Sequence, residues 1–288
     1  MNVLVTGGSG FLGSHLVEKL IKNGDNVVII DNVCGASIMD EEVGERFGGV
    51  DVVFHLAALT RPQWSIGHPI DSNLINVEGT LRVFKHCNMY GVKRVVFVSS
   101  SSLYGENVCP TPEDAVPNPM SPYALQKWIG EQYAWLFEKL YGMEINCIRP
   151  FNVYGSRQTP GGPYAAAVPN FISYLNKGET PWITGDGNQA RDFIYVDDVI
   201  DLMILLATCK EHGEAFNAGS GKNVSINNLY KEICSIMGKD VRPNYIPKVF
   251  EPSQTLADMS KVKRMFGWKP KVSLHEGLER TIRESVSA

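Results

Sequence analysis

The sequence predicts an α/β protein with a doubly wound parallel sheet and a second, smaller α/β domain. In the first 150 residues, short β-branched runs alternate with stretches that carry apolar residues at helical spacing. After residue 150 the chain becomes rich in Gly, Pro and Asn. Strands that alternate with helices form parallel sheets covered on both faces, so we expect the sheet in residues 1–150 and the smaller domain in residues 151–288.

The elements of the first domain follow from these patterns. Strands are predicted over 2–6, 26–31, 51–56, 93–99 and 144–149, where the runs are short and largely apolar, as in buried parallel strands. Helices are predicted over 11–22, 74–89 and 123–140, the last opened by Ser121-Pro122, a helix-start signal. In the second domain, helices are predicted at 168–176, 196–207, 226–237, 260–266 and 274–283, with some segments returning to the first domain.

The segment between Asp31 and Asp51 is unusually short. A parallel crossover normally needs a dozen or more residues, so a full third strand with two flanking helices does not fit here. We expect residues 36–39 to form a vestigial third strand and residues 40–47 one short helix.

Composition excludes several classes of function. The net charge of −4 gives no electrostatic reason to expect binding to nucleic acid. None of the six cysteines forms a Cys-x-x-Cys pair or has zinc-ligand spacing, so no metal site is expected. The chain has no signal-peptide pattern and no apolar run of about 20 residues, so we expect a cytoplasmic protein that does not enter a membrane.

A glycine-rich loop follows the first strand and opens the first helix, with the sequence Gly7-Gly8-Ser9-Gly10-Phe11-Leu12-Gly13. In a βαβ unit this pattern predicts a Rossmann-type dinucleotide site: Gly7 permits the turn, Gly10 lets the backbone approach a pyrophosphate, and Gly13 lets helix and strand pack. The alternative is a tight turn without a ligand.

Asp31, at the end of the next strand, predicts which dinucleotide binds. A carboxylate there accepts hydrogen bonds from ribose hydroxyls and repels a 2′-phosphate, which favours NAD over NADP. The alternative is a solvated Asp at a strand end.

A candidate catalytic group lies downstream of this loop. Tyr123 and Lys127 are four residues apart, on one face of a helix. A neighbouring ammonium favours the phenolate, so the pair can act as a general base. The serines at 99–102 follow a parallel strand, where open α/β sheets bind ligands. Each motif alone is common, and its alternative is an exposed helix face or a polar turn; their order along the chain is more specific.

Further motifs run over nearly the whole chain. They are His55-Leu56-Ala57-Ala58, Asn76-Val77-Glu78-Gly79-Thr80, Leu103-Tyr104-Gly105, Arg149-Pro150-Phe151-Asn152-Val153-Tyr154-Gly155, Gly185-Asp186-Gly187-Asn188-Gln189-Ala190-Arg191-Asp192-Phe193, Ala257-Asp258 and Gly267-Trp268-Lys269-Pro270. With the glycine loop and Tyr-Ala-Leu-Gln-Lys, they resemble the extended short-chain dehydrogenase/reductases of the NAD-dependent epimerase/dehydratase kind, and most of all the UDP-hexose 4-epimerases.

The resemblance implies roles for individual residues. The catalytic residues would be Ser100, Tyr123 and Lys127. NAD would be bound by Gly7, Gly10, Phe11, Leu12, Asp31, Asn32, Ser37, Ile38, Leu56, Ala57, Ala58, Asn76, Tyr123, Lys127 and Phe151. The UDP-sugar would be bound by Ser100, Ser101, Tyr123, Asn152, Val168, Arg191, Lys248 and Asp258.

The implied reaction is reversible oxidation at the sugar C4, with return of the hydride to the other face. The phosphates of the substrate would meet Arg191, whose alternative role is an ion pair with Asp186 or Asp192. The resemblance also implies a homodimer through helices 74–89 and 123–140; alternatively, both helices only cover their own sheet.

Three positions depart from the family pattern. Ser37 and Ile38 replace an Asp that meets adenine, and Lys248 replaces an Arg that contacts phosphate. Thr255 is small where epimerases restricted to unacetylated sugars carry a bulky residue, and residues 155–167 resemble those of epimerases that accept UDP-N-acetylhexosamines. Both features favour acceptance of N-acetylated sugars.

The alternatives differ at Ser101 and Ser102. In the family, 4,6-dehydratases carry Asp-Glu at these positions, and UDP-glucuronate decarboxylases typically carry Glu at the second. The serines therefore favour an epimerase, including one that acts on UDP-glucuronate. A non-catalytic NAD-binding module is a further alternative, although such proteins usually lose Tyr or Lys.

Overall fold

The computed structural model describes residues 1–161 and 166–286, which form two compact units. The first unit contains Met1–Tyr104, Pro117–Pro150 and Ile200–Phe216. The second contains the described parts of 105–116, 151–199 and 217–286. The chain therefore crosses between the units several times, and residues 105–116 belong with the later part of the chain.

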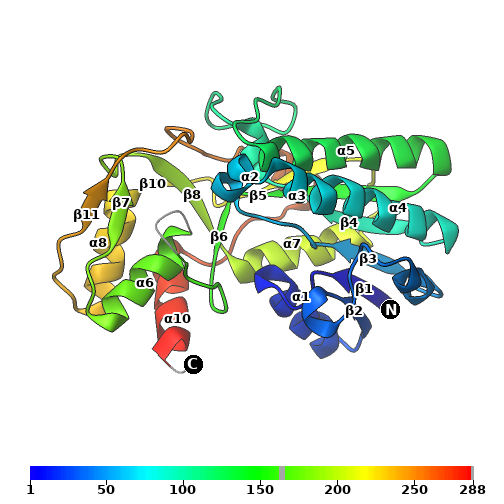
Figure 1. Cartoon of the computed structure of the whole chain (residues 1–288), viewed down its shortest axis with the longest axis horizontal. Coiled ribbons are helices and arrows are strands. Elements are labelled where there is room, and N and C mark those ends of the chain that lie inside the picture. The colour runs from blue at the N-terminus through cyan, green and yellow to red at the C-terminus, as the bar shows by residue number, and fades with distance from the viewer. Residues whose placement is uncertain (162–165, 287–288) are drawn as a thin grey trace. The chain divides into compact units, whose positions relative to one another are not determined.

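The first unit is built on a sheet of six strands (Figure 1). Its order is β2-β1-β3-β4-β5-β9, and the pairings from β2 to β5 are parallel. This confirms the predicted Rossmann-type α/β sheet. The strands are β1 (Asn2–Thr6), β2 (Asn26–Ile30), β3 (Val52–His55), β4 (Arg94–Val98), β5 (Glu144–Pro150) and β9 (Ala215–Ala218).

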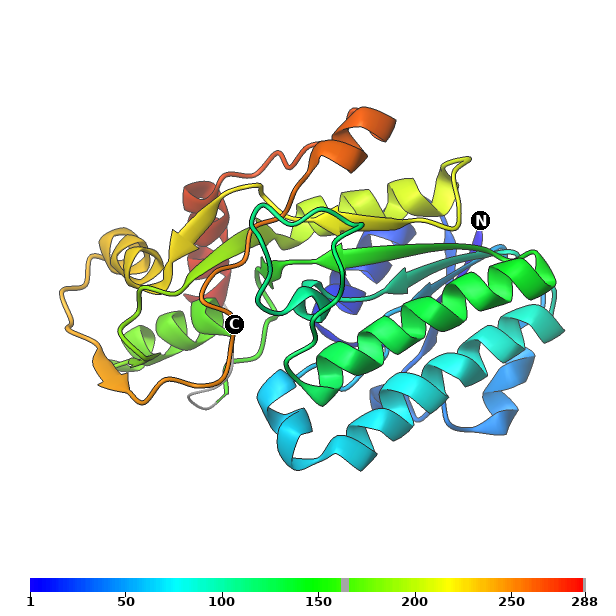
Figure 2. The same cartoon turned by 90° about the horizontal axis from the view of Figure 1, so that it is seen from above.

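Helices cover both faces of this sheet. In Figure 2, α4 and α5 lie on one face, whereas α1 and the part of α7 that belongs to this unit lie on the other. The helices are α1 (Phe11–Lys22), α2 (Pro62–Gly67), α3 (Pro69–Asn73), α4 (Thr80–Met89), α5 (Pro122–Tyr141) and α7 (Val196–Thr208). The predicted helix at 74–89 begins as a π-helix, Leu74–Gly79, before it continues as α4.

The core between the sheet and α4–α5 is rich in aromatic rings. Phe84 of α4 lies 5.9 Å from Phe97 of β4 and 5.6 Å from Phe137 of α5, measured between ring centroids. Burial of each side chain of this size stabilises the folded state by about 1.5–3 kcal/mol. This packing fixes α5, which carries Tyr123 and Lys127, against the sheet.

The prediction of a vestigial third strand at residues 36–39 is wrong. These residues pair with no strand, and β2 is the edge of the sheet. The segment instead turns inward, because Ala36, Ile38, Val43 and Phe47 are buried in the core. The short helix predicted at 40–47 is confirmed as a 3₁₀ helix, Glu41–Phe47, and a 3₁₀ turn, Asn32–Cys34, follows β2.

The second unit carries two small sheets, ordered β10-β8-β6 and β11-β7. Their strands are β6 (Asn152–Tyr154), β7 (Trp182–Thr184), β8 (Ala190–Tyr195), β10 (Asn223–Ser225) and β11 (Asn244–Ile246). Its helices are α6 (Ala167–Lys177), α8 (Ile226–Met237), α9 (Ser260–Phe266) and α10 (Leu274–Val286), at the predicted places.

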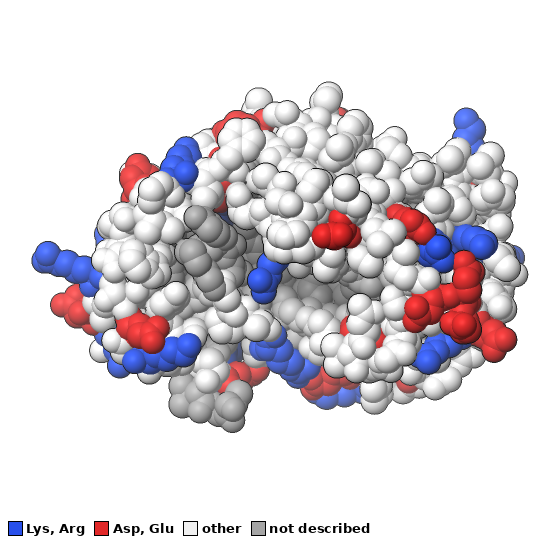
Figure 3. Space-filling model, viewed as in Figure 1, with Lys and Arg blue, Asp and Glu red and all other residues white. Residues whose placement is uncertain are grey.

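The surface is mixed in charge. On the face drawn in Figure 3, acidic and basic side chains are interspersed with a large uncharged area, in keeping with the net charge of −4. None of the helices in the described part of the chain is long and apolar enough to cross a membrane.

Candidate active site

The glycine loop has the backbone geometry that its sequence predicts. Gly7 has φ of +71°, and a Cβ added there would lie 2.7 Å from the Ala57 amide nitrogen. A Cβ added at Gly13 would lie 2.0 Å from the carbonyl oxygen of Gly7. Side chains at either position would therefore push the turn apart.

Helix α1 begins at this loop with an N-terminus suited to an anion. Its N-cap is Gly10, which supplies no side-chain hydrogen bond to the first turn. The amides of that turn and the positive end of the helix dipole are therefore suited to a pyrophosphate. The residues present fit a dinucleotide.

Asp31 links this loop to the turn that follows β2. Its carboxylate accepts hydrogen bonds from the backbone amides of Ser9 and Val33, each at 3.0 Å. A carboxylate offers about four lone-pair sites, so acceptor capacity remains for ribose hydroxyls.

Other residues predicted to bind the cofactor follow β3 or β2. Leu56 and Ala57 lie beside the glycine loop, because their amides donate to the carbonyl and the hydroxyl of Thr6, at 3.1 and 3.2 Å. Ala58 follows them and is half-buried, and Asn32 is exposed.

At the predicted adenine position, Ser37 is half-buried, and its hydroxyl accepts from the amide of Met39. Ile38 is buried and packs against Gly79, so little of its side chain is left for a nucleotide.

The structure brings Ser100, Tyr123 and Lys127 together at the carboxyl end of β4. The hydroxyl of Ser121 caps α5, which puts Tyr123 and Lys127 in its first two turns. Lys127 Nζ donates to the carbonyl of Val98 at 2.7 Å, and the side chains of Tyr123 and Ser100 are hydrogen-bonded. Ser100 Oγ also accepts from the amide and the hydroxyl of Ser102, at 3.1 and 2.8 Å.

Burial controls the ionisation of this group. It raises the pKa of Tyr123 to about 12, although the hydrogen bond with Ser100 lowers it in part. Burial lowers the pKa of Lys127 to about 8, and the charge of Glu131 opposes that fall. Tyr123 therefore needs positive charge nearby before it can act as a base near neutral pH.

Asn76 lies in the π-helix and is nearly fully buried. Its side chain accepts from the amide of Leu59 at 2.8 Å, and it donates to the carbonyl of Leu59 and to Gln126 Oε1, at 3.0 and 2.9 Å. Sequence reasoning passed over Gln126, although an amide side chain on the buried face of a helix, directly before Lys127, was an available signal. Asn76 is thus tied to the helix that carries Tyr123 and Lys127.

In the second unit, Arg191 is held by an ion pair. Its guanidinium lies 2.9 Å from the carboxylate of Glu251 and not against Asp186 or Asp192, so the alternative partners considered from the sequence are wrong. Asp192 instead accepts from the backbone amides of Ser220, Gly221 and Ala257. Glu251 was not singled out in the sequence, because nothing in its spacing connects it to Arg191.

The remaining predicted residues of this unit have varied environments. Asn152 Nδ2 donates to the Asp192 carbonyl at 3.1 Å and lies 3.4 Å from the hydroxyl of Thr255. Lys248 is exposed. The pKa of Glu106 is lowered mainly by hydrogen bonds from Ser253 and that of Asp186 mainly by hydrogen bonds from Asn188, and the charge of Lys248 adds to both effects.

Four more predicted residues have known positions. Phe151 and Val168 are buried, and the carboxylate of Asp258 accepts from the amide of Ser260 at the start of α9. Ser101 begins the 3₁₀ helix Ser101–Tyr104 in the first unit. The predicted N-acetyl signature at 155–167 lies partly outside the described residues.

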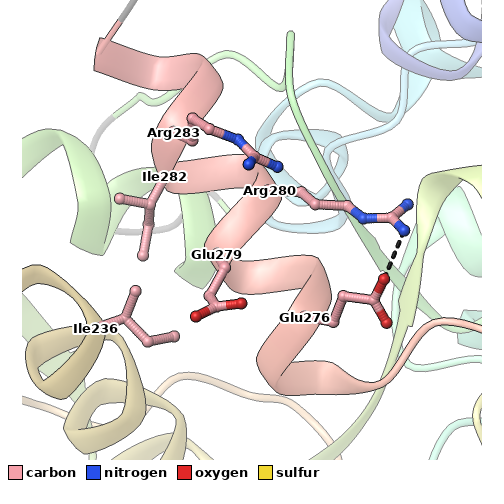
Figure 4. Close-up of a pocket in the computed structure, with 6 residues that line it drawn as sticks. All are labelled: Ile236, Glu276, Glu279, Arg280, Ile282 and Arg283. Carbon is pink, nitrogen blue, oxygen red and sulfur yellow. Dashed lines mark hydrogen bonds and ion pairs between the residues drawn. The ribbon is translucent and has the colours of Figure 1, made fainter.

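A separate pocket of about 580 Å³ lies against α8 and α10 (Figure 4). Its lining contains the ion-paired Glu276 and Arg280 together with Ile236 and Ile282. None of the predicted site residues lines it. Within the described residues, no cluster of His, Cys, Asp or Glu could hold a metal ion.

The chain is similar to known proteins over most of its length. The sequence profile of the NAD dependent epimerase/dehydratase family matches residues 3–219. The UDP-glucose 4-epimerase of Mycolicibacterium smegmatis is 34% identical, with 98% of this chain and 97% of that protein covered.

Solved structures are similar over the whole chain. The crystal structure of the UDP-glucose 4-epimerase of Thermotoga maritima with UDP-glucose has a TM-score of 0.95 and 39% identity, and the match covers 100% of this chain and 99% of that one. The UDP-N-acetylglucosamine 4-epimerase of Methanobrevibacter ruminantium has a TM-score of 0.94 and 36% identity, over 99% and 98%. Other relatives are named UDP-glucuronate 4-epimerase and UDP-N-acetyl-alpha-D-glucosaminuronate decarboxylase. This chain belongs to the NAD dependent epimerase/dehydratase family.

Proposed function

We propose that this chain epimerises a UDP-hexose at C4, with bound NAD as the redox cofactor. The observation that carries the proposal is the group formed by Ser100, Tyr123 and Lys127 at the carboxyl end of β4, downstream of the dinucleotide loop. When bound, NAD would supply the reversible hydride acceptor that oxidation and re-reduction at C4 require.

The residues of the chain would handle the proton and the position of the sugar. Tyr123 would take the proton of the 4-hydroxyl, and Ser100 would hydrogen-bond the same oxygen. The Lys127 ammonium would favour the phenolate of Tyr123 by its charge. Gly7, Gly10 and Asp31 would hold the pyrophosphate and ribose of NAD, and Asn152, Arg191 and Lys248 would bind the UDP-sugar.

The turn after Ser100 supports epimerisation over elimination. A 4,6-dehydratase needs an extra acid and base to remove water, whereas this turn offers Ser101 and Ser102. The hydroxyl of Ser102 is already used as a donor to Ser100. UDP-glucuronate remains a second candidate substrate, because a relative that is 33% identical is a UDP-glucuronate 4-epimerase.

UDP-glucose and UDP-galactose are the proposed substrates, with the N-acetylhexosamine forms as further ones. Thr255 supports the wider range, because its small side chain lies within 3.4 Å of Asn152 Nδ2, a group proposed to bind the substrate. The active form would be a homodimer.

Turnover of UDP-glucose, UDP-N-acetylglucosamine and UDP-glucuronate with added NAD tests the proposal, with products separated by chromatography. We expect conversion to the C4 epimer, and dehydrated or decarboxylated products would contradict it. Tyr123→Phe should abolish turnover and leave NAD binding intact. Wild-type protein that binds NAD and converts no sugar would instead support a non-catalytic module.

A further inference from the structure

A fully buried ion pair lies behind the candidate catalytic group. Glu131 is 0% exposed, and the Arg149 side chain is 3% exposed. Arg149 binds both carboxylate oxygens of Glu131, with Nε 2.9 Å from Oε1 and Nη2 2.6 Å from Oε2. Its Nη1 donates to the hydroxyl of Tyr104 at 2.8 Å. The pair is thus bidentate and extends to a third side chain.

These three residues come from the elements that carry the catalytic side chains. Glu131 is on α5, one turn beyond Lys127 and two turns beyond Tyr123. Tyr104 ends the 3₁₀ helix that follows Ser100, and Arg149 is on β5, beside β4. The cluster therefore joins the helix of the base to the turn of the catalytic hydroxyl.

Stability alone gives a weak reason for such a pair. Desolvation of two charges offsets most of their attraction, and apolar replacements of similar volume are often as stable. A role in the electrostatics of the site is a better explanation. The charge of Glu131 acts on Lys127, whose own burial disfavours the ammonium.

Two other titratable groups among the described residues are relevant to Lys127. Tyr123 is on the same helix, and His55 of β3 also interacts with the ammonium. Burial lowers the pKa of His55 to about 3, so this imidazole is neutral at working pH. Among the described residues, Glu131 is therefore the group that supplies negative charge to Lys127.

We propose that Glu131, clamped by Arg149, is a positioning residue that keeps α5 in register with the Ser100 turn and stabilises the ammonium of Lys127. The activity readout rests on the proposed function. Direct titration of Lys127 does not, so a failure of the epimerase assignment and a failure of this proposal can be told apart.

The test is NMR titration of the lysine Nζ and Cε resonances in wild-type protein and in Glu131→Gln, with Lys127→Met to assign the signal. Loss of an opposite charge at close range should lower the midpoint of Lys127 by about one pH unit. The pH at which kcat falls on the alkaline side should decrease by the same amount. Glu138→Gln is the matched control: it lies on the same helix, and its carboxylate pairs with His212 at 2.7 Å.

A second variant removes the risk that an unpaired Arg149 prevents folding. Glu131→Leu combined with Arg149→Met removes both charges and should fold. It should lower the Lys127 midpoint by less than Glu131→Gln does, because loss of the Arg149 positive charge acts in the opposite direction. An unchanged midpoint in both variants overturns the proposal. Unfolding of both variants where Glu138→Gln stays folded would assign the pair to stability alone, and would also overturn it.

Discussion

In the proposed reaction, we expect Lys127 to make turnover depend on pH. Burial lowers its pKa to about 8, so the ammonium is present below that pH and is lost above it. Under the proposed function, the phenolate of Tyr123 would depend on that positive charge, so we expect kcat to fall as the pH rises through about 8. The measurement is kcat from pH 6 to 10 at saturating substrate, with circular dichroism at each pH as the control for folding. A kcat that keeps rising from pH 8 to 10 would exclude a role for the ammonium.

The residues of the site differ in how well the sequence predicts them. Tyr123, Lys127 and Ser100 belong to a local motif and a strand end, so their meeting point follows from the parallel sheet. Glu131 and Arg149 lie 18 positions apart on different elements, and Arg191 and Glu251 are farther apart still. Nothing local in the sequence tells which distant charges meet, so tertiary packing was needed to identify both pairs.

The turn between β1 and α1 leaves no room for a side chain at position 13. A Cβ at position 13 would lie 2.0 Å from the Gly7 carbonyl oxygen. Because that oxygen belongs to the backbone, the clash can be relieved only if the turn itself moves. We expect Gly13→Ala to lower the free energy of unfolding by about 1–3 kcal/mol, the usual cost of overpacking, and to abolish NAD binding. Chemical denaturation and calorimetric titration with NAD measure the two effects.

Gly67→Ala is the matched control for this prediction. Gly67 ends α2, and an added Cβ would meet nothing within 4 Å. Its effect on stability should stay within about 0.5 kcal/mol, as for ordinary surface changes. Equal losses in the two variants would show that the glycine loop has no special packing requirement.

Helices and strands with a strong hydrophobic periodicity lie where the sequence predicts them. The wrong prediction is the short strand at residues 36–39. Residues 36–39 have the apolar character of a strand, yet Ala36 and Ile38 fill the edge of the core while the backbone turns. Because so few residues connect β2 and β3, this segment packs its apolar side chains onto the core and adds no strand to the edge of the sheet. Pattern alone does not separate a short apolar turn from a short buried strand.

At the scale of the whole molecule, α5 carries apolar side chains that its own unit does not cover. Ala134 and Phe137 face the core, whereas Leu125, Leu136 and Leu140 are 41%, 45% and 59% exposed. The three leucines repeat at helical spacing on one side of α5. They therefore remain available after the sheet is covered, and this favours the predicted homodimer over helices that only cover their own sheet.

Sedimentation equilibrium tests the oligomeric state. Wild-type protein should sediment at twice the chain mass of 31.9 kDa, and Leu136→Glu combined with Leu140→Glu should sediment as a monomer, because two carboxylates per chain would be buried without partners. Val108→Glu, at an apolar residue that is 82% exposed in the second unit, should leave the mass unchanged. A monomeric wild-type protein would mean that these leucines are simply exposed. An unaffected dimer in the double variant would place the interface on another surface.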